Sequence, residues 1–105
     1  MYRLGNDGLK ALIPYLEYEY LLNIKRLDFS YNNLNDAGLE PLVHSLASLS
    51  SPIEDFNISG NNLSDGIVKI ICDYIKNGKL KHLSNVIIED CPKVSEDGRR
   101  ILRIA

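Results

Sequence analysis

The chain of 105 residues contains two copies of one segment, offset by 29 residues. Residues 24–34 read IKRLDFSYNNL and residues 53–63 read IEDFNISGNNL. In both copies apolar residues occupy the first, fourth, sixth and eleventh positions, and asparagine occupies the ninth. Repeats of this length are typical of solenoids, whose units bury their apolar faces only by stacking on one another. The repeat therefore predicts a stacked architecture, and it favours binding over catalysis.

Each copy predicts a strand, a turn and a helix, in that order. Leu27 and Phe29 alternate with polar residues, which is the pattern of a half-buried strand, and Phe56 does the same in the second copy. The asparagine pairs that follow favour a turn. Beyond the turn, apolar residues recur at helical spacing, and the predicted N-caps are Asp36 in one copy and Ser64 or Asp65 in the other.

Two further units are recognisable at the ends. The last is divergent: its strand and turn positions hold Val86, Ile88 and Cys91, and its helix carries Ile101 and Leu102. The first contains only the second half of a unit. The sequence thus predicts a single repeat domain over 1–105, with a partial unit at 1–23, full units at 24–52 and 53–82, and a divergent last unit at 83–105.

These residues resemble the leucine-rich repeat family, whose L-x-x-L-x-L-x-x-N/C-x-L pattern recurs over nearly the whole chain. The Asp-x-Gly and full helix that follow it are similar to the ribonuclease-inhibitor-like subfamily. The resemblance implies an α/β fold: a short, curved solenoid with a parallel three-stranded sheet on the concave side and helices on the convex side. The chain departs from the pattern at Phe29 and Phe56, where leucine is usual, and in the register of its helical glycines.

The first helix contains two unusual features. Pro14 lies inside it, so we expect a kink or a break there, because proline lacks an N–H and its ring clashes with the preceding turn. Tyr15, Tyr18 and Tyr20 crowd its end. We expect one or two of these tyrosines to pack in the core between units, and any that remain exposed to form an aromatic patch typical of protein interfaces.

Alternate strand residues point to opposite faces, so the fifth and seventh positions of each repeat should face the concave side. This face is polar and mildly acidic, and it would suit a basic or hydrogen-bonding segment of another protein. A solvated sheet face without a partner fits the same pattern equally well. The predicted partner-binding residues are Arg26, Asp28, Ser30, Asp55, Asn57, Ser59, Ile87 and Glu89.

Nothing in the sequence indicates a catalytic or metal site. Asn32, Asn61 and Cys91 recur once per unit at the turn, which is the pattern of an internal ladder that satisfies loop backbone. His44 and His82 have no metal ligand or catalytic partner at a suitable spacing, and no glycine-rich phosphate loop is present. We therefore predict a non-enzymatic protein with no cofactor, no metal and no small-molecule substrate.

The net charge of −2 gives no general reason to bind nucleic acid or an anionic membrane. A basic cluster near the C-terminus leaves an RNA or an acidic protein as a less favoured alternative, although cations at helix C-termini need no partner. Its residues are Lys79, Lys81, Arg99, Arg100 and Arg103. No apolar stretch approaches a membrane span or a signal peptide, and two cysteines are too few for a disulfide framework, so we expect an intracellular, cytoplasmic protein.

The terminal units carry none of the polar caps that repeat arrays normally have. We expect their ends to be covered by neighbouring subunits, or the sequence to be an excerpt of a longer solenoid. The favoured function is a protein-protein interaction module or a small assembly subunit, which binds through the concave face and the uncapped ends. Two alternatives stay open: a structural component of a large ribosomal, axonemal or respiratory complex, and a regulator of a small GTPase, which some relatives of this repeat class activate.

Overall fold

The computed structural model describes residues 3–104 of the chain, in which strands and helices alternate after a helical start. The elements are α1 (Gly5–Tyr15), η1 (Leu16–Tyr20), β1 (Arg26–Asp28), α2 (Asp36–Ser48), β2 (Asp55–Asn57), α3 (Asp65–Lys76), β3 (Asn85–Ile87) and α4 (Glu96–Ile104). The side chains of Ile101, Leu102 and Arg103, for which the sequence made predictions, lie outside the described part of the chain.

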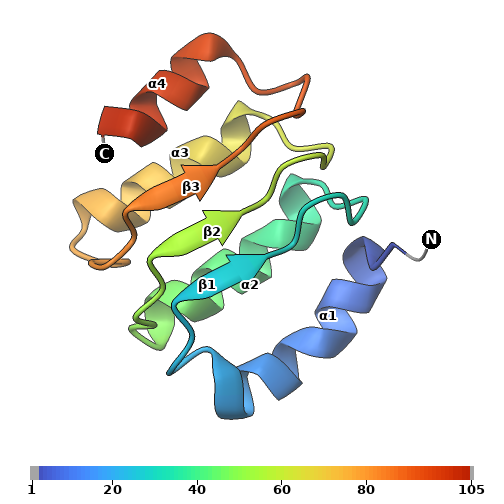
Figure 1. Cartoon of the computed structure of the whole chain (residues 1–105), viewed down its shortest axis with the longest axis vertical. Coiled ribbons are helices and arrows are strands. Elements are labelled where there is room, and N and C mark those ends of the chain that lie inside the picture. Colours follow the sequence, from blue (N-terminus) through green and yellow to red (C-terminus); the bar gives the residue numbers. More distant parts are fainter. Residues whose placement is uncertain (1–2, 105) are drawn as a thin grey trace.

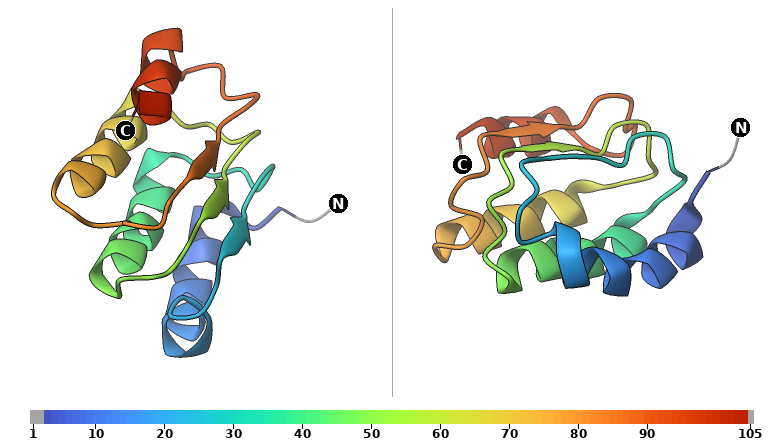
Figure 2. Two further views of the ribbon diagram at one scale, coloured as in Figure 1. Left: turned by 60° about the vertical axis from the view of Figure 1, so that its left-hand side comes forward. Right: turned by 60° about the horizontal axis from the view of Figure 1, so that its bottom comes forward.

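The three strands form one parallel sheet in the order β1-β2-β3. Leu27 is aligned with Phe56, and Phe56 with Val86, so equivalent residues of successive units lie side by side. The helices cover one face of this sheet and leave the other open (Figures 1 and 2). Each helix packs beside the next, from α1 to α4. This arrangement confirms the predicted mixed α/β fold with a parallel three-stranded sheet.

The core lies between the sheet and the helices, and the apolar positions of the repeat fill it. Phe56 is 2% exposed, and Ile53, Ile58 and Leu63 are fully buried. The helices contribute buried residues at helical spacing: Leu39, Leu42, Val43 and Leu46 from α2, and Ile67, Val68, Ile71 and Cys72 from α3. The periodicity of the sequence therefore identified most of the core, although Val68 was not among the predicted residues.

Asn61 confirms the predicted internal ladder. Its Oδ1 accepts hydrogen bonds from the backbone N–H groups of Asn32 (3.1 Å) and Leu34 (3.0 Å), which belong to the preceding unit. Its Nδ2 donates to the carbonyls of Phe29, Ile58 and Ser59. Because Asn61 is only 3% exposed, these bonds satisfy backbone groups that water cannot reach.

The prediction that Asp36 caps the second helix is wrong. The N-cap is Asn35, whose side chain accepts a hydrogen bond from the Gly38 N–H. Of the two candidates in the next unit, Ser64 is the cap of α3. Asp36 instead reaches the following unit, where its carboxylate accepts hydrogen bonds from the backbone N–H and the hydroxyl of Ser64.

The contact made by Asp36 recurs along the stack and forms a second ladder, which joins the N-termini of neighbouring helices. Asn6 accepts from the Asn35 N–H (3.2 Å), and Asp65 accepts from the Ser95 N–H (2.8 Å). The backbone N–H of Ser95, followed by its hydroxyl, holds the pKa of Asp65 below its usual value. A helix N-terminus favours a carboxylate at this position in any case.

The first helix changes its geometry just after Pro14, and its tyrosines differ from the expectation. The α-helix continues through Pro14 and changes at Leu16 to π-helical geometry, in which the Leu21 N–H bonds to the Leu16 carbonyl (2.9 Å). The wider turn brings Leu21 into the core, fully buried. Tyr15, Tyr18 and Tyr20 are 72%, 83% and 56% exposed, so the predicted packing of one or two of them in the core is wrong.

Candidate functional site

The face of the sheet that points away from the helices carries two rows of side chains, and we call it the open sheet face. The first row holds Arg26, Asp55 and Asn85, because these residues are aligned in the register of the strands. The second row holds Asp28, Asn57 and Ile87. The inward residues between the rows, Leu27 and Phe56, are buried. Strand alternation thus places six side chains on one surface.

These six residues line a shallow depression of about 290 Å³, together with Leu27. The structure therefore brings together Arg26, Asp28, Asp55, Asn57 and Ile87 of the predicted partner-binding residues. Asn85, which the prediction left out, completes the lining. Its place follows from the register, since Asn85 is the partner of Asp55 on the third strand.

The remaining predicted residues follow the strands and differ from one another in exposure. Glu89 is exposed and Ser30 is half-buried. Ser59, however, is only 5% exposed, and its Oγ accepts a hydrogen bond from the Glu89 N–H (2.8 Å). Ser59 is thus engaged inside the sheet, and its hydroxyl has little surface to offer to another protein.

The charges of the open sheet face are predominantly negative. The Arg26 Nε lies 3.2 Å from Asp55 Oδ2, so this pair is internally compensated. Asp28 has no cationic partner among the described residues, but its Oδ1 accepts hydrogen bonds from the hydroxyl (2.6 Å) and the N–H (2.9 Å) of Ser30. The Ser30 hydroxyl, and after it the Ser30 N–H, lowers the pKa of Asp28. Asp28 therefore stays ionised at neutral pH and presents its charge on this face.

A contact that the sequence did not reveal joins the turns beside this face. The Tyr31 hydroxyl donates a hydrogen bond to Asp90, and its ring passes over Gly60, where an added Cβ would lie 2.2 Å from the ring. Tyr31, Gly60 and Asp90 occupy equivalent places in successive units, and all three have positive φ angles of 56°, 69° and 52°. The hydrogen bond to Asp90 raises the pKa of Tyr31. The sequence signal for this contact is Gly60, at the eighth position of the unit at 53–82.

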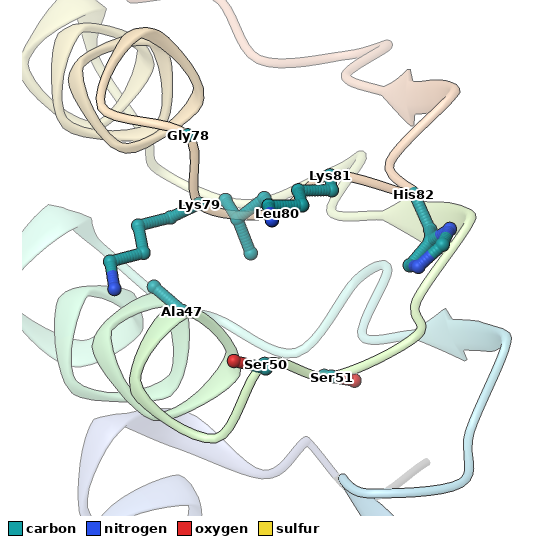
Figure 3. Close-up of a pocket in the computed structure, with 8 residues that line it drawn as sticks. All are labelled: Ala47, Ser50, Ser51, Gly78, Lys79, Leu80, Lys81 and His82. Carbon is teal, nitrogen blue, oxygen red and sulfur yellow. The ribbon is translucent and has the colours of Figure 1, made fainter.

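The basic residues predicted as an alternative patch lie in two places. Lys79, Lys81 and His82 line a pocket of about 350 Å³ between the segments that follow α2 and α3 (Figure 3). Arg99 and Arg100 belong to α4, where Arg100 is 4.0 Å from Asp97. Arg99 borders a different depression, beside Glu89 and Asp90. The described basic residues therefore do not form one continuous surface.

The candidate metal ligands of the described residues lie apart from one another, and the thiols are buried. Within residues 3–104, no three histidine, cysteine or acidic side chains are grouped closely enough to hold a metal ion. Both thiols are free and buried, and burial raises the pKa of Cys72. His44 Nδ1 lies 2.9 Å from the Tyr74 hydroxyl, on the helical side of the molecule. No described helix is both long and apolar enough to cross a membrane.

The strand, the turn and the helix recur in one register, and two hydrogen-bond ladders join successive units. A family model described as Leucine Rich repeat matches residues 20–43. No curated protein sequence matches the chain. The match covers β1, its turn and the first half of α2, and it supports a leucine-rich repeat protein. Leucine-rich repeat domains generally mediate protein–protein interaction.

Proposed function

We propose that the chain is a leucine-rich repeat protein of the ribonuclease-inhibitor-like kind, whose open sheet face is the concave side of a short solenoid and binds a basic segment of another protein. The observation that carries the proposal is the pair of aligned rows on this face, with the uncompensated carboxylate of Asp28 in one of them. Glu89 adds an exposed carboxylate beyond β3. An extended chain with basic side chains would complement this face in charge and in spacing.

The partner-binding residues that we propose are Arg26, Asp28, Ser30, Asp55, Asn57, Ile87 and Glu89. Ser59 leaves the predicted set because it is buried and hydrogen-bonded. Asn85 joins it. In this proposal the protein is a non-catalytic assembly subunit inside the cell, and its role is to hold a partner in place.

The face can be tested by removing charge without removing hydrogen bonds. Asp28→Asn keeps the oxygen that accepts from Ser30, and Glu89→Gln keeps the size of the side chain. We expect this double variant to bind lysine- and arginine-containing peptides about fivefold more weakly, because each exposed ion pair contributes about 0.2–1 kcal/mol. Isothermal titration calorimetry at two salt concentrations measures the loss, which should shrink at the higher salt.

The matched control carries the same charge change on the helical side, at the exposed residues Glu40 and Asp73. Glu40→Gln with Asp73→Asn should bind the peptides as the natural chain does. Equal losses in both double variants would show that net charge, and not this face, governs binding. Unchanged binding in the Asp28→Asn, Glu89→Gln variant would refute the proposal.

The two rival functions predict different results for the same two double variants. A structural component held by its ends and helices would keep its native partners in the face variant. Affinity purification of both double variants from the native source, followed by mass spectrometry, separates this case from the proposed one. A regulator of a small GTPase would alter nucleotide hydrolysis by candidate GTPases, and we expect no change in that assay.

A further inference from the structure

The pocket between the segments that follow α2 and α3 lies within the stack, where the unit at 24–52 meets the unit at 53–82, and we call it the loop pocket. Figure 3 shows the two segments facing each other across it. Its volume is about 350 Å³, and it is lined by Ala47, Ser50, Ser51, Gly78, Lys79, Leu80, Lys81 and His82. Ala47, Ser51 and Leu80 are buried, so they form its inner wall, and the exposed residues form its rim.

Ser51 contributes a polar group for which the described fold provides no partner. Its side chain is 2% exposed, and its Oγ has no hydrogen-bond partner among the described residues. In the loops before β1 and β3, the buried residue of this segment is a leucine, Leu21 and Leu80 respectively. Because a buried hydroxyl without a partner is unfavourable, serine at this place lowers stability relative to an apolar residue. A bound ligand that supplies the missing partner would explain it.

The rim of the loop pocket is cationic. Lys79 and Lys81 supply two positive charges, and neither forms an ion pair with a described residue. His82 adds a ring that can donate a hydrogen bond. The lining contains no acidic side chain. In a chain with a net charge of −2, the pocket is therefore a local concentration of positive charge.

The ends of the two helices do not account for this arrangement. A helix C-terminus attracts cations through carbonyls that lack a partner. Here the Leu46 carbonyl accepts from the Ser51 N–H (3.1 Å), and the Tyr74 carbonyl accepts from the Lys79 N–H (2.9 Å). Backbone groups thus already satisfy these carbonyls, and the helix ends give no reason for an unpartnered hydroxyl beside the lysines.

We propose that the loop pocket binds a phosphate monoester, whose oxygens accept hydrogen bonds from the ammonium groups of Lys79 and Lys81 and from the hydroxyl of Ser51. A monoester has three acceptor oxygens and a charge of about −1.5 to −2 at neutral pH. This matches two lysines and a hydroxyl better than a carboxylate does, which has two oxygens and a single charge. The site is separate from the open sheet face and does not depend on the function proposed for it.

A free small molecule and a phosphorylated side chain of another protein share this chemistry, and an NMR titration of the natural chain distinguishes them. We expect O-phosphoserine and inorganic phosphate to shift the backbone amide signals of Ser51, Lys81 and His82, and unphosphorylated serine to leave them unchanged. A phosphoserine peptide that binds more tightly than O-phosphoserine would support the site with a protein as the source. Equal or weaker binding of the peptide would support it with a small molecule as the source. No shift of these amides at millimolar O-phosphoserine would overturn the proposal.

Ser51→Ala separates binding of the ligand from a structural role. We expect this variant to bind O-phosphoserine about tenfold more weakly, because a hydrogen bond to a charged group is lost. The midpoint of thermal denaturation without ligand should stay the same or rise, because the variant has no unpartnered hydroxyl. A lower midpoint together with unchanged affinity would show that the hydroxyl serves the fold alone, and it would overturn the proposal.

The charges are tested by Lys79→Gln with Lys81→Gln. The matched control is Lys10→Gln with Lys69→Gln, which changes two exposed lysines of α1 and α3 outside the pocket. We expect the pocket variant to lose about tenfold in affinity for O-phosphoserine or more, and the control to bind as the natural chain does. Equal losses in both would show that net charge alone attracts the anion, which would refute the proposal.

Two further measurements define the ligand and the site. An RNA oligonucleotide, whose internal phosphates are diesters, should bind more weakly than O-phosphoserine. Tighter binding of the RNA at the same amides would assign the pocket to nucleic acid and overturn the monoester proposal. The Asp28→Asn, Glu89→Gln variant should bind O-phosphoserine as the natural chain does, whereas a weaker affinity would contradict the independence of the two sites.

Discussion

Asn61 and Asn32 occupy equivalent positions in successive units, but their side chains make different numbers of hydrogen bonds. Among residues 3–104, Asn61 makes five side-chain hydrogen bonds to backbone groups, and Asn32 makes two. Asn61 lies between two strand–turn segments that the structure describes, whereas for Asn32 it describes only the one that follows. Position in the stack, and not residue type, therefore sets the contribution of each ladder residue to stability.

This difference predicts unequal effects of alanine at the two positions. We expect Asn61→Ala to lower the free energy of unfolding by about 3 kcal/mol, because it leaves several buried backbone groups without hydrogen-bond partners. Asn32→Ala should lower it by about 1 kcal/mol. Urea denaturation followed by circular dichroism measures both. Equal losses would mean that the hydrogen bonds of Asn61 have no more effect on stability than those of Asn32.

The period of the sequence predicts the ladder residues, but it does not predict what Asp36 and Asp65 do. A carboxylate at a helix N-terminus is normally expected to cap its own helix. The choice between that role and a bond to the next unit depends on the distance between stacked helices, which appears only when the units are assembled. The same holds for Tyr31 and Asp90, which are 59 residues apart in the sequence. They belong to two units with another unit between them, so their contact appears only when all three are stacked.

At the scale of elements, a steric constraint explains why glycine occupies the first turn of each later helix. A Cβ added to Gly38 would lie 1.8 Å from Asn6 Oδ1, and one added to Gly98 would lie 2.5 Å from Asp65 Oδ1. At Gly66 the nearest atom is Asp36 Oδ2, at 2.9 Å. Each glycine thus admits the polar side chain of the preceding unit. The apparent slip of Gly66 in the sequence register does not disturb this contact.

Gly38→Ala should therefore behave unlike an ordinary substitution in a helix. Alanine is a better helix former than glycine by about 1 kcal/mol, but here its methyl group would displace Asn6 from Asn35. We expect Gly38→Ala to destabilise the natural chain by about 1 kcal/mol and to be neutral or stabilising in an Asn6→Ala background. Thermal denaturation of the four proteins of this cycle measures the coupling, and additive effects would contradict the steric explanation.

The elements also show where sequence reasoning about the open sheet face succeeded and where it failed. Strand alternation placed Arg26, Asp28, Asp55, Asn57 and Ile87 together, because period-two patterns are local. The burial of Ser59 was not predictable, since it depends on a hydrogen bond to Glu89 in the next unit. The exposure of Tyr18 and Tyr20 was not predicted because they lie in a π-helical turn, which changes which residues face inward.

At the scale of the whole molecule, the unit at 53–82 is the best-protected part. It has a neighbour on each side, and Ile53, Ile58 and Leu63 within it are fully buried. The first unit contributes exposed Leu12 and Leu22 instead, at 36% and 51%. In a stacked array each unit draws its stability from its neighbours, so the units at the ends should open first.

Native-state hydrogen exchange tests this order. We expect the amides of Phe29 and Ile58, which donate to the following strand, to be among the slowest to exchange. Backbone amides at the N-terminus of α1 should exchange faster by several powers of ten, because local opening of an end requires less free energy than global unfolding. Uniform protection from α1 to β3 would instead indicate a single cooperative unit.

The hydrogen bond between Tyr31 and Asp90 links two units that are not adjacent, so their stabilities are not independent. Arrays of repeats are normally described by interactions between adjacent units alone, so that a disturbance fades from one unit to the next. Here a side chain from the second unit spans Gly60 and holds the fourth. A ligand that fixed the Tyr31 side chain would therefore act directly on Asp90, which follows β3. Its effect would not have to pass through β2.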